Sequence, residues 1–157
     1  MNYPGYNTAN FVFLDGEWYP FKIFKLVQLQ DDKYYYILQD INGLKHFLPS
    51  EFYENYGFKI GEEVLCRIDR INCTGRLFLE PKHPDYEQGE SYSFEIISYS
   101  EKVNEKTLLV REKYGKTIEL NVNNMLKADI ITEKFVRCKV LNLKKGIPLL
   151  EVVFNSL

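Results

Sequence analysis

Residues 43–80 read GLKHFLPSEFYENYGFKIGEEVLCRIDRINCTGRLFLE, and residues 115–151 read GKTIELNVNNMLKADIITEKFVRCKVLNLKKGIPLLE. Gly43 and Cys66 lie 23 positions apart, as do Gly115 and Cys138, and the two glycines are 72 positions apart. Both stretches end in Leu-Glu. A period of this length is too long for a solenoid repeat and fits a small domain. The sequence therefore predicts two copies of one small domain.

The strand pattern is clearest over residues 63–71, where apolar and polar side chains alternate with the two-residue period of a β-strand. Its apolar face recurs in the second copy, so that Val64, Cys66 and Ile68 are matched by Val136, Cys138 and Val140. We expect Cys66 and Cys138 to lie in the two cores, where a free thiol behaves as a small apolar residue.

Similar patterns predict five strands in each copy. The first copy has them at residues 21–28, 34–39, 44–48, 63–71 and 76–80, with a short helix beginning at Pro49-Ser50-Glu51. The second has them at residues 92–98, 107–112, 116–122, around Cys138, and 148–153, with a helix or loop at residues 123–131. Three strands, a short helical link and two more strands is the order of an OB-fold barrel. The predicted fold is mainly all-β, two tandem five-stranded OB-fold barrels with at most one short helix each.

Four segments follow from this interpretation. Residues 1–17 are expected to lie outside the repeat as an N-terminal hairpin extension, because Asp15-Gly16 favours a tight turn between Phe11 and Trp18. Residues 18–82 form the first barrel, residues 83–90 form a linker that Pro81 and Pro84 stiffen, and residues 91–157 form the second barrel. The hairpin either caps the first barrel or presents an apolar edge to a protein partner.

Composition narrows the functional classes. The chain is 45% hydrophobic and 15% aromatic, which suits a packed β-protein, and its net charge of −2 gives no strong bulk attraction to nucleic acid. No signal peptide or apolar stretch of membrane-spanning length is visible, and the three cysteines form no C-x-x-C pair. We expect a cytoplasmic protein with free thiols, no membrane association, no metal and no cofactor. The two histidines fit no recognised catalytic spacing, so an enzyme is not expected.

Three motifs in the first copy occur in a familiar order. They are Gly43-Leu44-Lys45-His46, Ile60-Gly61-Glu62-Glu63-Val64 and Asn72-Cys73-Thr74-Gly75-Arg76. Residues 18–82 thus resemble the RNA-binding repeat of ribosomal protein S-one, although Asn72 stands where that family usually has Asp, and Phe47-Leu48-Pro49 separates His46 from Ser50.

The resemblance implies single-stranded RNA bound across the second and third strands by aromatic stacking. The residues it implicates in nucleic-acid binding are Tyr34, Tyr35, Tyr36, Lys45, His46, Arg67, Asn72 and Arg76. Because a strand alternates sides, either Tyr35 alone or Tyr34 and Tyr36 together face outward. Arg76 contacts a phosphate or base, or instead pairs with Asp69 or Glu80 as a surface salt bridge. The sequence does not distinguish RNA from single-stranded DNA.

The second copy lacks these features, with no histidine after Gly115 and no aromatic cluster in its second strand. It is expected either to serve as a structural or protein-contacting module, or to track a phosphate backbone through its basic residues, which are Arg111, Lys113, Lys116, Arg137 and Lys139. The leading functional hypothesis is a non-catalytic RNA-binding protein. The alternative is a protein-interaction adaptor that reuses the barrel without nucleic acid.

Overall fold

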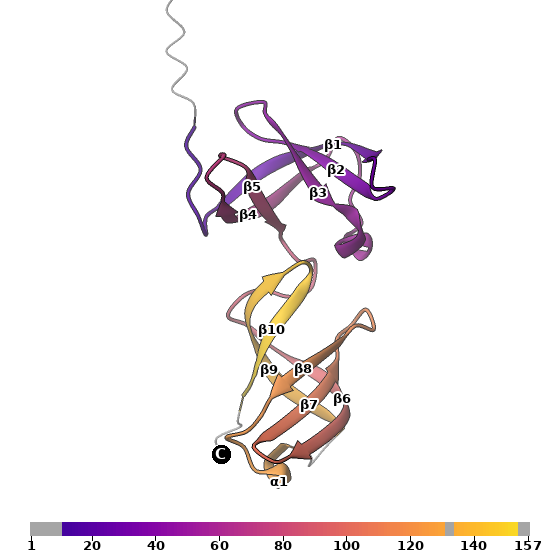
Figure 1. Ribbon diagram of the computed structural model, residues 1–157, viewed down its shortest axis with the longest axis vertical. Coiled ribbons are helices and arrows are strands. Elements are labelled where there is room, and N and C mark those ends of the chain that lie inside the picture. Colours follow the sequence, from indigo (N-terminus) through magenta and orange to yellow (C-terminus); the bar gives the residue numbers. More distant parts are fainter. Residues whose placement is uncertain (1–10, 131–133, 154–157) are drawn as a thin grey trace, which may run out of the picture. The chain divides into compact units, whose positions relative to one another are not determined.

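A computed structural model describes residues 11–130 and 134–153 (Figure 1). The chain divides into two compact units, residues 1–82 and 83–157. Each unit contains one five-stranded antiparallel sheet, and α1 (Lys127–Ile130) is the single α-helix of the described residues. The prediction of a mainly all-β chain with two five-stranded units is therefore confirmed. No helix within the described ranges is both long enough and apolar enough to cross a membrane.

The first unit runs from indigo to magenta in Figure 1. Its strands are β1 (Trp18–Gln28), β2 (Tyr34–Gln39), β3 (Lys45–Pro49), β4 (Glu63–Ile71) and β5 (Leu77–Pro81). Their order in the sheet is β3-β2-β1-β4-β5, so β1 is the central strand and pairs with both β2 and β4. The edge strands β3 and β5 approach within 8 Å between Cα atoms, which nearly closes the sheet into a barrel.

The helix predicted after Pro49 is present only as two single 3₁₀ turns, η1 (Ser50–Phe52) and η2 (Glu54–Tyr56). Gly57 follows immediately with a φ of 69°, a left-handed conformation that ends the second turn. Tyr53 lies between the turns and is buried, and its hydroxyl donates a hydrogen bond to Glu80 Oε2 at 2.9 Å. The short turns thus bring an aromatic ring to the barrel core.

The second unit repeats this topology. Its strands are β6 (Ser91–Lys102), β7 (Glu105–Arg111), β8 (Thr117–Asn121), β9 (Phe135–Lys144) and β10 (Ile147–Val152), in the sheet order β10-β9-β6-β7-β8. Cys66 and Cys138 are fully buried at equivalent places in β4 and β9, as predicted, and burial raises the pKa of the Cys138 thiol to about 12. Each core is a cluster of apolar side chains from its own unit.

The repeat extends further toward the N-terminus than the sequence predicted. Tyr19 and Tyr92 occupy the same place in β1 and β6. The Tyr19 hydroxyl accepts a hydrogen bond from the backbone N–H of Leu14 at 3.0 Å, and the Tyr92 hydroxyl accepts one from the backbone N–H of Glu87 at 2.8 Å. In both units the segment before the first strand is therefore fastened by a tyrosine of that strand.

Two predicted boundaries are corrected by these contacts. The segment before Trp18 belongs to the repeat, and its described part contains the Asp15-Gly16 turn but no strand from Phe11 to Leu14, so the hairpin prediction is wrong there. Phe13 instead packs against the first core. Residues 83–90 are not a free linker, because Tyr86 belongs to the second core. Residues 1–10 of the predicted extension lie outside the described residues.

The segment before the first strand of each unit is called its leading segment here, and His83 shows how firmly the leading segment of the second unit is held. Its side chain is 4% exposed, and its Nδ1 accepts hydrogen bonds from the backbone N–H groups of Asp85 and Tyr86 at 3.0 and 3.1 Å. Burial lowers the pKa of His83 to about 4, and nearby Lys116 and Lys113 act in the same direction while Asp85 opposes them. Only the neutral ring fits this site.

The stability of the second unit should therefore depend on pH through His83. Because its folded pKa lies below its ordinary value near 6.5, the contribution is complete above pH 6.5 and is lost as the pH falls toward 4. We expect a loss of about 1–3 kcal/mol in unfolding free energy across this window. Urea titrations followed by NMR signals of β6–β10 measure it. His83→Asn keeps an acceptor that does not titrate and should flatten the curve, whereas parallel curves for the two proteins contradict the assignment.

Candidate nucleic-acid interface

One groove of about 510 Å³ opens on the first unit between β2, β3 and the β4–β5 turn. It combines aromatic, cationic and small polar side chains. Its lining residues are Leu29, Tyr35, Lys45, His46, Phe47, Thr74, Gly75, Arg76 and Leu77. Tyr35, Lys45, His46 and Arg76, four of the eight residues singled out from the sequence, meet here.

The tyrosine run in β2 divides between three environments. Tyr35 lines the groove, with its ring edge-on to Phe47 at 6.1 Å between centroids. Tyr36 packs on the core side against Phe58, at 5.3 Å between ring centroids. Tyr34 is 52% exposed at the start of the strand and does not line the groove. Of the two registers left open by alternation, the structure has Tyr35 facing the groove.

Tyr35 is also held by a charged neighbour. Its hydroxyl donates a hydrogen bond to Asp31 Oδ2 at 2.6 Å, and Asp31 Oδ1 accepts one from the backbone N–H of Lys33 at 3.1 Å. The hydrogen bond raises the pKa of Tyr35 and lowers the pKa of Asp31. This tether restricts the ring at the groove, which preorganises it for a flat ligand.

His46 reaches the groove from the inner side of β3. Its Nε2 lies 2.7 Å from Asp40 Oδ2, and its ring meets the core residue Phe21 edge-on at 5.9 Å. The Asp40 carboxylate is buried, and its other oxygen accepts hydrogen bonds from the backbone N–H groups of Asn42 and Leu44. His46 is therefore a fixed polar edge of the groove rather than a freely stacking ring. The sequence motif did not reveal Asp40 as its partner.

Asn72 and Arg76 share the β4–β5 turn but have different roles. Asn72 Oδ1 accepts hydrogen bonds from Thr74 N, Thr74 Oγ1 and Arg76 N at 3.1, 2.7 and 2.8 Å. Asn72 thus shapes the turn and does not line the groove. This turn places Arg76 at the rim of the groove, where its guanidinium carbon lies 4.9 Å from the centre of the Phe78 ring.

The two ion pairs considered for Arg76 are not formed. Asp69 lies 3.5 Å from Arg67, and Glu80 accepts a hydrogen bond from Tyr53. Across the part of the chain that the structure describes, no carboxylate lies within 4.0 Å of Arg76. Its charge is therefore available to an anion.

Lys45 and Arg67 fall in different places. Lys45 is exposed on β3, lines the groove and has its Nζ 4.1 Å from the centre of the Phe24 ring. Arg67 is only 7% exposed on the inner strand β4, with its guanidinium 5.9 Å from the Trp18 ring centre, and it does not reach the groove. Its cross-strand neighbours are Trp18 and Glu80. The polar face that the sequence assigned to β4 is thus not simply a solvent face.

Sequence reasoning missed Phe47, which is 47% exposed and supplies the second aromatic ring of the groove. It also missed Leu29, from the β1–β2 turn. A signal for Phe47 was present, because His46 and Leu48 point inward and alternation sends Lys45 and Phe47 to the other face. No such signal was present for Leu29, because a turn residue belongs to no periodic pattern.

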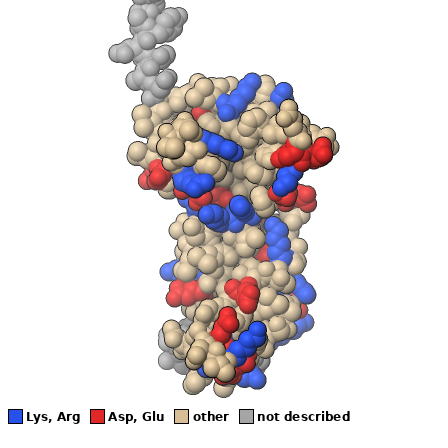
Figure 2. Space-filling model, viewed as in Figure 1, with Lys and Arg blue, Asp and Glu red and all other residues tan. Residues whose placement is uncertain are grey.

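Charge on the molecule is mixed rather than uniformly basic. Figure 2 shows Lys and Arg interspersed with Asp and Glu on the face in view, in keeping with the net charge of −2. The groove itself is locally cationic through Lys45 and Arg76, with Asp31 bonded to its tyrosine. No group of three or more His, Cys, Asp and Glu side chains in the described residues is placed to hold a metal ion.

The second unit keeps the scaffold of the groove but not its chemistry. At the spacing of 72, Tyr35 is matched by Thr107, His46 by the buried Ile118, and Phe47 by Glu119. The buried Asp40 has its counterpart in the buried Glu112. Each carboxylate accepts a hydrogen bond from the backbone N–H of the residue four positions later, which is Leu44 for Asp40 and Lys116 for Glu112. Of the five basic residues considered for phosphate tracking, Arg111 pairs with Glu95 at 3.3 Å and Lys113 with Asp85 at 2.7 Å.

No model of a known protein family matches this chain, and no curated protein matches it. The class that the structure itself defines is a mainly β protein of two repeated five-stranded antiparallel units, the first of which carries an aromatic and cationic groove.

Proposed function

We propose that this protein binds single-stranded RNA in the groove of its first unit and does so without catalysis. The strand order β3-β2-β1-β4-β5 and the near contact of β3 with β5 support an OB-fold of the ribosomal protein S-one type. The observation that carries the proposal is the meeting of Tyr35, Phe47, His46 and Arg76 at one groove from separate elements.

The chemistry of these groups suits an unpaired nucleotide. Every base has a flat face, and stacking on an aromatic ring contributes about 1–3 kcal/mol per base. Tyr35 and Phe47 offer such rings, His46 offers a polar ring whose Nε2 is held by Asp40, and Arg76 offers a guanidinium with no carboxylate within 4.0 Å among the described residues. The mixed surface charge supplies little long-range attraction, so we expect modest affinity that falls with salt.

A cytoplasmic location is part of the proposal. Cys66, Cys73 and Cys138 are free thiols, and unpaired cysteines are typical of a reducing compartment. Cys73 is exposed in the β4–β5 turn, where an oxidising environment would leave it open to intermolecular pairing.

Fluorescence-anisotropy titration of a labelled mixed-sequence single-stranded RNA at low and moderate salt tests the proposal. The comparators are the same sequence as single-stranded DNA and as duplex RNA. We expect saturable binding to single strands, weaker binding to the duplex because its bases are not free to stack, and a decrease with salt. No binding to any single strand at low salt contradicts the proposal.

That negative outcome would favour a protein-interaction adaptor. The observation behind this second candidate is the apolar surface of the leading segment, where Val12 is 73% and Leu14 is 60% exposed. Exposed apolar side chains in a cluster mark protein contacts more often than isolated ones do.

A further inference from the structure

Strand β4 contains an irregularity that changes where its arginines point. Its pairing with β5 shifts between Ile68, opposite Leu79, and Arg70, opposite Phe78, so Asp69 is an extra residue in the ladder. A β-bulge of this kind re-aims the side chains beside it and is common near binding sites. Asp69 lies 3.5 Å from Arg67, and Arg70, next to the bulge, lies over Phe78 with its guanidinium carbon 4.1 Å from the ring centre.

The Phe78 ring therefore carries two cations. Arg76 approaches it from the β4–β5 turn at 4.9 Å, and Arg70 from the bulge at 4.1 Å. Both arginines are exposed, and within the described ranges no carboxylate lies within 4.0 Å of either. Two like charges on one ring repel each other, and each is attracted to the ring face. An anion between or beside them would relieve the repulsion.

We propose that Arg70, Phe78 and Arg76 form a phosphate clamp for the backbone of the bound RNA. Arg76 belongs both to the clamp and to the groove, so the two sites are continuous. The bases then stack at Tyr35 and Phe47, and the backbone runs along the β4–β5 hairpin toward Arg70. A planar guanidinium donates two parallel hydrogen bonds to a phosphate, which makes arginine the suited residue for this place. The inference rests on the proposed function and adds the path of the strand to it.

The salt dependence of binding tests the clamp, because it reports the number of phosphates that the protein neutralises. For single strands the slope of log K against log salt changes by about 0.7 for each phosphate contact. We expect Arg70→Gln to reduce the magnitude of the slope by about this amount and to weaken binding several-fold at low salt. Arg70→Lys retains the charge and should restore most of the slope.

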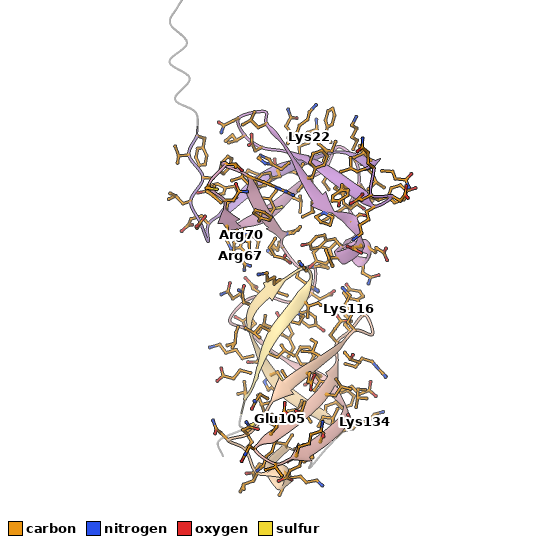
Figure 3. The ribbon with its side chains drawn as sticks, in the orientation of Figure 1. Lys22, Arg67, Arg70, Glu105, Lys116 and Lys134 are labelled. Carbon is orange, nitrogen blue, oxygen red and sulfur yellow. The ribbon has the colours of Figure 1, made fainter. Side chains whose placement is uncertain are left out.

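Lys22→Gln is the matched control, since Lys22 is an exposed cation of the same unit without a carboxylate within 4.0 Å among the described residues. Figure 3 shows Lys22 and Arg70 on different sides of this unit. We expect its slope to equal that of the wild type. An equal reduction in Lys22→Gln would mean a net-charge effect and would overturn the clamp.

The outcomes for the clamp and for the groove are separable. If wild-type protein binds RNA, Tyr35→Ala weakens that binding and Arg70→Gln leaves the slope unchanged, the clamp is wrong and the proposed function stands. If the wild type binds no RNA, both fail. A one-dimensional NMR spectrum of each variant establishes that the substitution at the exposed Arg70 leaves the fold intact.

Discussion

Replacing Tyr35 with alanine should weaken single-stranded RNA binding about 5- to 150-fold, the equivalent of the 1–3 kcal/mol that one stacked base contributes. Tyr35 is the ring of the β2 run that faces the groove, and its neighbour Phe47 lies edge-on to it at 6.1 Å. Without the Tyr35 ring, only Phe47 of these two rings remains for a base to stack on. Anisotropy titrations at a fixed low salt concentration measure the change in Kd.

Two matched variants separate stacking from other effects. Tyr34→Ala removes the adjacent tyrosine, which is 52% exposed but lies outside the groove, and it should leave the affinity unchanged. Tyr35→Phe keeps the ring and loses the hydrogen bond to Asp31, so it should retain most of the binding. Equal losses in Tyr34→Ala and Tyr35→Ala would show that the ligand does not follow the groove, and the proposed site would be wrong.

The sequence was most informative where a periodic pattern had one physical cause. The range predicted for β4 matches the observed Glu63–Ile71, because apolar and polar residues alternate along it in the sequence, although Cys66, Arg67 and Ile68 are all buried. The leading segments were missed although both carry Gly-Glu shortly before the tyrosine, Gly16-Glu17 before Tyr19 and Gly89-Glu90 before Tyr92, and both glycines have positive φ angles. The donors Leu14 and Glu87 differ, because a contact made by a backbone N–H places almost no constraint on the side chain of the residue that donates it.

Part of the candidate site was predictable and part was not. The motif around His46 and the turn motif around Arg76 singled out two residues that line the same groove. Three successive tyrosines could not be assigned to faces, since alternation fixes only their relative orientation. Arg67 is buried and does not line the groove, which the sequence could not reveal, because a polar position in a strand looks the same in sequence whether solvent or Trp18 covers it. The bulge that aims Arg70 at Phe78 has no sequence signal of its own.

Phe21→Ala and Phe94→Ala should each lower the unfolding free energy of one unit by about 3–5 kcal/mol, the usual cost of deleting a buried aromatic side chain. The two residues are equivalent, and each is 1% exposed in its own core. Small domains have about 5–15 kcal/mol of stability in total, so either loss is a large fraction of it. Urea titrations followed by NMR signals from β1–β5 and from β6–β10 report the two units separately.

The pair also connects the fold to the proposed function. The centroid of the Phe21 ring lies 5.9 Å from that of His46 and 6.0 Å from that of Phe13. Removing the Phe21 ring therefore loosens both the inner wall of the groove and the leading segment. We therefore expect Phe21→Ala to lose RNA binding, and Phe94→Ala to retain it while its own unit is equally destabilised, because no residue of the groove belongs to the second core. A single shared unfolding transition in either variant, or loss of binding in Phe94→Ala, would mean that the two cores are coupled and that the second unit contributes to the site.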